Sequence, residues 1–352
     1  MTFADRRVVI TGGAGFIGTN VARRVLADGG QVVILDDLSR AGVKENLRRL
    51  RADAPTDGLR IEIGDVRQAP VVRRMLRGAD TVFHFAAQVA VTTSITDPKH
   101  DFSVNLGGTL TLLEAIRHMP DPPALLFTST NKVYGKLLDV PIVRRSARYQ
   151  PSAASVRRHG IGEARSLEFC SPYGCSKGGA DQYILDYADT YGLPAVVFRM
   201  SCIYGPHQCG NEDQGWLAHF LLQALADREI SIFGDGMQVR DALFVDDLVD
   251  AMDAALTRIE LTSGRAFNIG GGPANTVSLL ELLTLIESLG NCAPRVTFHD
   301  WRTGDQRWYV SDTRAFTKLT RWSPKVGVAA GVERLRDWLL EHRVVEAMEA
   351  AM

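Results

Sequence analysis

The chain has 352 residues and a net charge of −1, with 45% hydrophobic and 23% charged residues. This balance is typical of a globular protein, and the lack of a basic surplus disfavours a nucleic-acid partner. No apolar run is long enough to span a bilayer, and the apolar start is broken by glycines and lacks a signal-peptide cleavage site. Five cysteines without a CxxC pair favour free thiols. We therefore expect a cytoplasmic protein without a membrane partner.

Strand-like and helix-like segments alternate along the first two hundred residues. Apolar runs predict strands, and segments with apolar residues at helical spacing predict helices between them. Such alternation indicates parallel strands joined by right-handed crossovers, and hence an α/β fold with a doubly wound parallel sheet. After about residue 205 the pattern loosens, which indicates a smaller lobe. The expected strands are 6–12, 31–37, 59–65, 81–87, 123–130 and 193–201, and the expected helices are 16–29, 43–53, 71–76, 105–118 and 171–191.

A glycine pattern, Gly12-x-x-Gly15-x-x-Gly18, follows the first strand and opens the first helix. Glycines there permit a tight turn and let backbone N–H groups approach a pyrophosphate at the helix N-terminus. Asp36 ends the second strand, where a carboxylate can bind an adenosine ribose and repel the extra phosphate of NADP. The context predicts a Rossmann site for NAD rather than a glycine-rich turn without a ligand, although nearby Arg40 leaves NADP open.

Two further strand ends fit the same cofactor. Gly64-Asp65-Val66 ends the third strand, where an adenine could be held. Ala86-Ala87 ends the fourth strand, and its small side chains would let a cofactor lie against the backbone.

A tyrosine and a lysine lie four residues apart in SPYGCSK. Ser171 can cap a helix and Pro172 suits its first turn, so Tyr173 and Lys177 share one helix face. Phenol has a pKa near ~10, but two nearby positive charges, an ammonium and a nicotinamide ring, would favour phenolate. Without the glycine motif, a tyrosine and a lysine at this spacing would more often be two solvated side chains on one helix face. In a chain that also has a nicotinamide-binding fold, the same spacing predicts an acid/base pair.

Several motifs together resemble the extended short-chain dehydrogenase/reductase family, the NAD-dependent epimerases and dehydratases of nucleotide sugars. They are TGGAGFIG, HFAA, VNLGGT, FTSTNKVYG, YGCSK and VRDALFVDDL, and the resemblance covers nearly the whole chain. Within the family, the pieces AQVAVTTSITDP, STNKVYG, EDQGW and FNIGGGPANTVSLLELL are most similar to the 2-epimerases of the CDP-paratose/CDP-tyvelose type.

The resemblance implies a Rossmann domain with a smaller α/β substrate-binding lobe, and a homodimer that pairs the helices 105–118 and 171–191 of two subunits. We expect 1–204 and 236–270 to form the NAD-binding domain and 205–235 and 271–352 to form the discontinuous substrate lobe. The residues that we expect to contact NAD are Gly12, Gly15, Phe16, Ile17, Gly18, Asp36, Asp37, Ser39, Arg40, Asp65, Val66, Ala86, Ala87, Gln88, Asn105, Thr128, Tyr173, Lys177 and Arg199.

The family mechanism implies that Tyr173 takes the proton of a sugar hydroxyl while NAD+ takes hydride from the same carbon. Lys177 would bind the nicotinamide ribose and lower the pKa of the tyrosine, and Thr130 would relay the proton. If the keto-sugar then rotates, re-reduction inverts the centre, which in the most similar group is C2. The catalytic candidates are Thr130, Tyr173, Lys177, Asn131, Glu163 and Cys170.

The resemblance also implies a nucleotide-sugar or nucleoside-sugar substrate. Arg240 and Arg302 match positions that grip the diphosphate and the nucleotide ribose, and guanidinium groups suit phosphate. The alternative for both is a surface ion pair. Cys202, His207 and Cys209 have metal-ligand side chains, but a fourth ligand and structural-zinc spacing are missing, so we expect no metal. The substrate-binding candidates are Lys132, His207, Gln208, Gln214, Arg240, Arg302 and Asp305.

Two departures from the most similar group keep other functions open. Gly162-Glu163 stands where those relatives read aspartate-glutamate, and Cys170 stands where they have a histidine before the serine-proline-tyrosine. Cys170 could be a packing residue or a mark of changed chemistry. One alternative is an oxidation-initiated dehydratase with Glu163 as base, and another is a non-catalytic NAD-binding regulator. The insertion 143–167, rich in arginine, is expected to lie over the active site.

Overall fold

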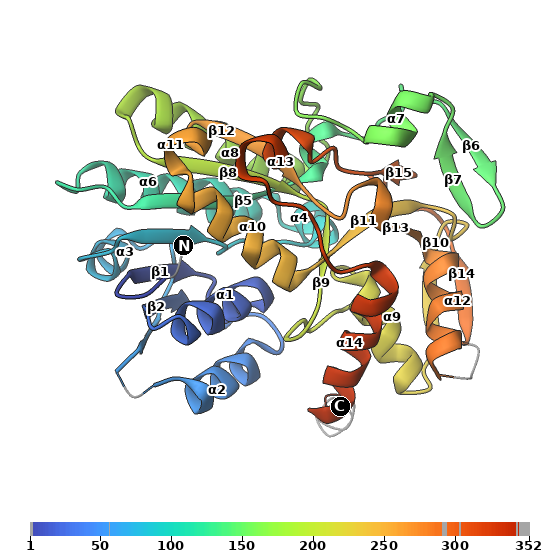
Figure 1. Ribbon diagram of the computed structural model, residues 1–352, viewed down its shortest axis with the longest axis horizontal. Coiled ribbons are helices and arrows are strands. Elements are labelled where there is room, and N and C mark those ends of the chain that lie inside the picture. The colour runs from blue at the N-terminus through green and yellow to red at the C-terminus, as the bar shows by residue number, and fades with distance from the viewer. Residues whose placement is uncertain (1–2, 56, 291–293, 303, 343, 345–352) are drawn as a thin grey trace.

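The computed structural model describes residues 3–55, 57–290, 294–302, 304–342 and 344. Seven parallel strands form one sheet in the order β12-β8-β5-β4-β1-β2-β3 (Figure 1). The order reverses between β1 and β4, which is the switch point where doubly wound sheets bind ligands. This confirms the predicted doubly wound α/β fold. The strands are β1 (Arg7–Thr11), β2 (Gln31–Asp36), β3 (Leu59–Ile63), β4 (Thr81–His84), β5 (Ala124–Thr130), β8 (Ala195–Met200) and β12 (Arg265–Ile269).

Helices cover both faces of this sheet, because most of its strands carry buried apolar side chains on both sides. One buried cluster joins Val25, Leu47 and Phe316 to one face, and a second joins Leu112 and Ile184 to the other. The first face is covered by α1 (Phe16–Ala27), α2 (Val43–Asp53), α10 (Val245–Thr257) and α13 (Arg314–Thr320), and the second by α3 (Ala69–Met75), α6 (Gly108–Arg117) and α8 (Ser171–Tyr191).

The smaller lobe has its own sheets and its own core, which includes Phe220, Leu282 and Leu335. In one sheet β11 pairs with β9, β13 and β15, and in another β10 pairs with β14. The elements are β9 (Cys202–Tyr204), α9 (Trp216–Leu225), β10 (Ile230–Phe233), β11 (Val239–Phe244), β13 (Thr276–Ser278), α12 (Leu279–Gly290), β14 (Val296–His299), β15 (Trp308–Tyr309) and α14 (Val328–Glu341).

The predicted division into two discontinuous domains stays a prediction, and the packing departs from it at two segments. The strand β11, expected in the NAD-binding domain, pairs only with strands of the smaller sheets. The helix α13, expected in the substrate lobe, places Phe316 in the core under the large sheet. No helix in the described part of the chain is long and apolar enough to cross a membrane.

The insertion 143–167 does not lie over the active site, which corrects that expectation. It forms the hairpin β6 (Ile142–Arg145) and β7 (Arg148–Pro151) and the short helix α7 (Ala154–His159) at the edge of the smaller lobe (Figure 1). Its arginines serve to dock it: Arg148 forms an ion pair of 2.5 Å with Glu281 of α12. None of its residues lines either of the two cavities described below.

Candidate active site

Two cavities meet at the carboxyl edge of the large sheet. The smaller cavity, of about 330 Å³, lies over the ends of β1, β2, β3 and β4. The larger cavity, of about 620 Å³, lies between the large sheet and the smaller lobe. Val89, Asp213 and Gln214 border both cavities, so a ligand in one can touch a ligand in the other.

The glycine turn after β1 forms one wall of the smaller cavity. Gly12 has a φ of 69°, and a Cβ there would lie 2.7 Å from the backbone nitrogen of Ala86. A Cβ on Gly18 would lie 2.5 Å from the carbonyl oxygen of Gly12. Only glycine fits at either position, so the turn stays tight and the N-terminus of α1 opens onto the cavity. This geometry suits the pyrophosphate of a dinucleotide.

The carboxylates after β2 form the opposite wall. Asp36 accepts hydrogen bonds from the backbone N–H of Ala14 (3.0 Å) and of Leu38 (2.9 Å), while burial raises its pKa. The side chain is therefore held at the ribose end of a dinucleotide site, where the residues present fit NAD. The predicted NAD contacts that line this cavity are Gly12, Gly15, Asp36, Asp37, Ser39, Arg40, Asp65, Val66, Ala86, Ala87 and Gln88, while Phe16 and Ile17 line the larger cavity.

Five predicted NAD contacts line neither cavity, namely Gly18, Asn105, Thr128, Lys177 and Arg199. Arg199 is buried in an ion pair with Asp181 of α8, at 2.8 and 2.9 Å, so a structural role replaces the expected contact. Asn105 exchanges two hydrogen bonds with the backbone of Gln88, at 2.8 and 3.0 Å, and acts by holding the loop after β4. Thr128 lies 3.5 Å from the carbonyl oxygen of His84, inside the sheet.

Two of the predicted acid/base residues, Thr130 and Tyr173, lie on the wall of the larger cavity. Thr130 ends β5, and its hydroxyl accepts a hydrogen bond from the N–H of Lys132 (3.2 Å). Tyr173 lies in the first turn of α8, where the hydroxyl of Ser171 accepts from the N–H of Gly174 (3.3 Å). The Thr130 hydroxyl favours ionisation of the Tyr173 phenol, while Lys177 lines neither cavity.

Burial has the largest effect on the pKa values of Tyr173 and Lys177. It raises the pKa of Tyr173 to about 12, against the opposing effects of the Thr130 hydroxyl and of the Arg40 charge. It lowers the pKa of Lys177 to about 7, although Asp181 and Asp101 favour the ammonium. The Nζ of Lys177 lies 4.1 Å from the ring centroid of Phe127. The protein alone therefore keeps Tyr173 protonated, contrary to the expected lowering of its pKa by Lys177.

The other catalytic candidates are placed differently from one another. Asn131 is buried and lines the larger cavity. Cys170 lies at its border, since its Sγ would be 3.5 Å from a Cβ on cavity-lining Gly304. Glu163 lines neither cavity. It accepts a hydrogen bond of 2.8 Å from the N–H of Asn268, and burial raises its pKa. The structure does not bring this candidate base to the site.

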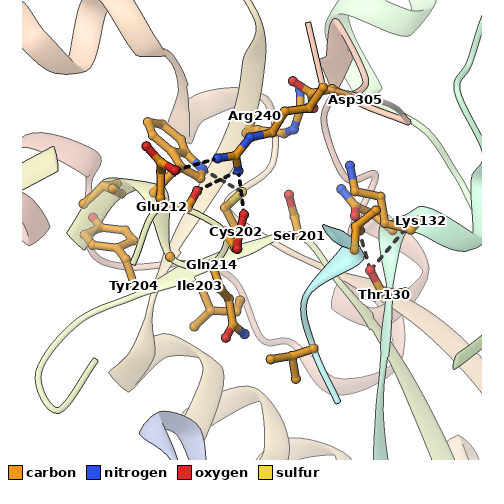
Figure 2. A pocket seen from close by; sticks show the side chains of 18 of the residues that line it. Thr130, Lys132, Ser201, Cys202, Ile203, Tyr204, Glu212, Gln214, Arg240 and Asp305 are labelled. Carbon is orange, nitrogen blue, oxygen red and sulfur yellow. Dashed lines mark hydrogen bonds and ion pairs between the residues drawn. The ribbon is translucent and has the colours of Figure 1, made fainter. Parts of the chain in front are cut away.

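Of the predicted substrate contacts, all but one line the larger cavity. Figure 2 shows Thr130 and Lys132 on one side of it and Glu212 on the other. His207 is the exception: it is buried, and its ring packs 4.9 Å from that of Trp338. The residues that line the cavity are Lys132, Gln208, Gln214, Arg240, Arg302 and Asp305.

The two arginines have different surroundings. Arg240 is buried and forms an ion pair of 2.6 Å with Asp305. The guanidinium of Arg302 lies 3.8 Å from the ring centroid of Phe233 and faces Glu212 and Asp213. Both arginines are thus ion-paired, as their alternative interpretation stated, yet both also line the cavity.

Several cavity residues were not predicted individually. Trp216, whose indole N–H donates to the sulfur of Cys202 (3.2 Å), lies in the EDQGW motif, which carried only the family resemblance. Ser201 follows β8 at the sheet edge, a position that signals a ligand site in this fold. Phe233 and Gln238 come from the smaller lobe and left no sequence signal. The described residues contain no group of three or more metal-ligand side chains.

Comparisons with known proteins agree with this arrangement. The model of the NAD dependent epimerase/dehydratase family matches residues 8–270. The chain is 41% identical to CDP-paratose 2-epimerase of Salmonella typhi, over 94% of this chain and 98% of that protein. It is 33% identical to dTDP-glucose 4,6-dehydratase of Streptomyces griseus, over 96% and 94%. The structure of the dTDP-glucose 4,6-dehydratase DesIV from Streptomyces venezuelae, with NAD and TYD bound, superposes with a TM-score of 0.81 at 30% identity, covering 96% and 98%.

Proposed function

The chain belongs to the NAD-dependent epimerase/dehydratase family, and we propose that it inverts C2 of a nucleotide-linked sugar. The observation that carries the proposal is that a cavity fitted to a dinucleotide adjoins a larger cavity whose wall holds Thr130 and Tyr173. The likeness to CDP-paratose 2-epimerase supports C2 as the reacting centre and a CDP-linked sugar as the substrate.

NAD, when bound, supplies a hydride acceptor for the sugar and a donor for the ketone. In our proposal Tyr173 takes the proton of the C2 hydroxyl, and the Thr130 hydroxyl, on the wall of the same cavity, orients that group and passes its proton. Since burial raises the pKa of Tyr173 to about 12, the phenol needs positive charge beside it before it can act as a base. Lys177, on the same face of α8, and the nicotinamide ring would provide that charge.

We propose that the substrate binds in the part of the larger cavity that Arg240 and Arg302 line. Arg240 and Arg302 offer guanidinium groups for a diphosphate, and Phe233 and Trp216 offer apolar faces for the nucleoside. The sugar would then reach Thr130 and Tyr173, passing Lys132. In our proposal a keto-sugar turns within this cavity, of about 620 Å³, and presents its other face.

Two alternatives are weaker. A dehydratase needs a base near the carbon beside the ketone, and Glu163 is held against Asn268, away from both cavities. A non-catalytic regulator has no need of a tyrosine and a threonine that share the wall of the larger cavity. We also propose a homodimer through α6 and α8, a cytoplasmic location and the two-domain division given above.

The proposal is tested by incubating the purified protein with NAD and a panel of CDP-, UDP-, GDP- and dTDP-sugars. Proton NMR and mass spectrometry of the products distinguish the reactions. A product of unchanged mass with inverted C2 supports the 2-epimerase. A product lighter by one water would instead identify a dehydratase, and no turnover of any sugar with NAD still bound would favour the regulator.

A further inference from the structure

The segment Asn211–Gln214 borders both cavities, and we call it the strap. Asn211, Asp213 and Gln214 line the smaller cavity, and Glu212, Asp213 and Gln214 line the larger one. The strap is a tight turn, because the side-chain oxygen of Asn211 accepts from the N–H groups of Asp213 (3.1 Å) and Gln214 (2.8 Å). Both acidic side chains are thereby presented beside the larger cavity.

Arg302 of the smaller lobe holds the strap through three contacts. Its Nη1 donates to the carbonyl oxygen of Glu212 (2.8 Å) and lies 3.2 Å from a carboxylate oxygen of Asp213. Its Nη2 lies 3.3 Å from a carboxylate oxygen of Glu212. On the other side, the guanidinium of Arg40, which lines the smaller cavity, donates to the side-chain oxygen of Gln214. The strap thus joins an arginine of each cavity.

A guanidinium group has one planar fork of donors, and two carboxylates beside it resemble a diphosphate in charge and in acceptor geometry. Arg302 lies over Phe233, which limits its movement to the side of the cavity. Its two terminal nitrogens are held by Glu212 and Asp213, so a diphosphate that binds these nitrogens must displace the two carboxylates. Arg240 differs, because its partner Asp305 binds only one edge and its other nitrogen donates to a backbone oxygen.

We propose that Glu212 and Asp213 are specificity-determining residues that compete with the substrate diphosphate for Arg302. This inference rests on the proposed function, since it requires a diphosphate in the larger cavity. A diphosphate displaces the two carboxylates and so releases the strap from the smaller lobe. A ligand without a diphosphate, such as a free sugar or a nucleoside, leaves the strap in place and gains nothing from Arg302.

The test is calorimetric titration of the NAD-loaded full-length protein with CDP, and with cytidine as the ligand that lacks phosphate. The double variant E212Q/D213N removes both charges and keeps the side-chain sizes. It should bind CDP about three- to tenfold more tightly than the wild type, the range expected for two partly exposed ion pairs. Its KM for the nucleotide sugar should fall in the same ratio, while cytidine binding stays unchanged.

A matched control is D227N/E333Q, which makes the same change in net charge at exposed carboxylates of the smaller lobe. It should bind CDP as the wild type does. Equal or weaker CDP binding by E212Q/D213N, or equal tightening by the control, would overturn the proposal and leave the proposed function intact. If the wild type binds none of CDP, UDP, GDP and dTDP, the proposed function fails and the competition fails with it.

Discussion

The two cavities of this protein are built in different ways. The smaller cavity is lined mainly by loops at the ends of four neighbouring strands, together with the strap, and its tight turn depends on backbone, as at Gly12 and Gly18. The larger cavity collects side chains from segments as distant as Ile95 and Arg302. The smaller cavity is therefore a dinucleotide site of fixed shape. The larger cavity is held together by ion pairs that a substrate can displace.

The largest effect on kcat is expected at Tyr173. Replacing Tyr173 with phenylalanine removes the proposed acid/base group without changing the packing of α8, so kcat should fall about 10²- to 10⁴-fold. Tyr183→Phe, at an exposed position of the same helix, is the matched control and should leave kcat unchanged. Steady-state turnover of the nucleotide sugar measures both. A Tyr173→Phe variant with wild-type kcat would remove the tyrosine from the mechanism.

The second prediction concerns Arg199, which was expected to contact NAD and lies in a buried ion pair. Arg199→Met leaves Asp181 buried without its partner, so the free energy of unfolding should fall by about 3–5 kcal/mol. The exposed pair of Arg23 and Asp53 is the control, and Arg23→Met should cost less than about 1 kcal/mol. Urea unfolding measures the difference. If Arg199→Met instead weakens NAD binding and leaves stability unchanged, the arginine is a cofactor ligand after all.

A smaller, pH-dependent effect is expected at Lys177. Burial lowers its pKa in the folded protein to about 7, below the ordinary value of 10.5. The stability that this residue contributes is therefore present above pH 10.5 and is lost as the pH falls toward 7, because the unfolded chain binds the proton more tightly. Lys177→Met should gain stability relative to the wild type as the pH falls from about 9.5 to 7.

Urea unfolding in the absence of NAD measures this trend, and the range avoids the ionisation of Tyr173. Exposed Lys99→Met should show no such trend. A stability difference between Lys177→Met and the wild type that is constant from pH 7 to 9.5 would show that Lys177 is not buried as described.

The smallest effect is expected at Glu163. Its carboxylate accepts a backbone hydrogen bond and lines neither cavity, so Glu163→Gln should change kcat by less than about threefold. A general base would show a loss of about 10²-fold or more. Such a loss, together with a product lighter by one water, would support the dehydratase function instead.

The sequence predicted the smaller cavity better than the larger one for a physical reason. Gly12, Asp36 and Ala86 lie at strand ends, and the ends of parallel strands meet at one edge whatever the rest of the chain does. Arg199 also lies near a strand end, but its side chain points to the face covered by α8, where Asp181 neutralises it. No local pattern reveals that partner.

The larger cavity depends on tertiary contacts that the spacing of residues in the sequence does not predict. Arg302 and Glu212 are ninety residues apart in the chain, yet they form an ion pair at the wall of the cavity. The insertion 143–167 was expected over the active site, but Arg148 ties it to Glu281 at the lobe's edge. His207 was expected to touch substrate and packs against Trp338 instead. The family resemblance supplied most of the correct cavity residues, since their positions follow the shared fold.

The most direct test of the central claim is the fate of the hydrogen at C2. A nucleotide sugar deuterated at C2 is incubated in ordinary water with the NAD-loaded protein, and the product is examined by NMR and mass spectrometry. Epimerisation by transient oxidation predicts inverted C2 with the deuterium retained there, because the same hydride leaves and returns inside a closed site. Loss of the deuterium to water, or a product without one water, would contradict the account.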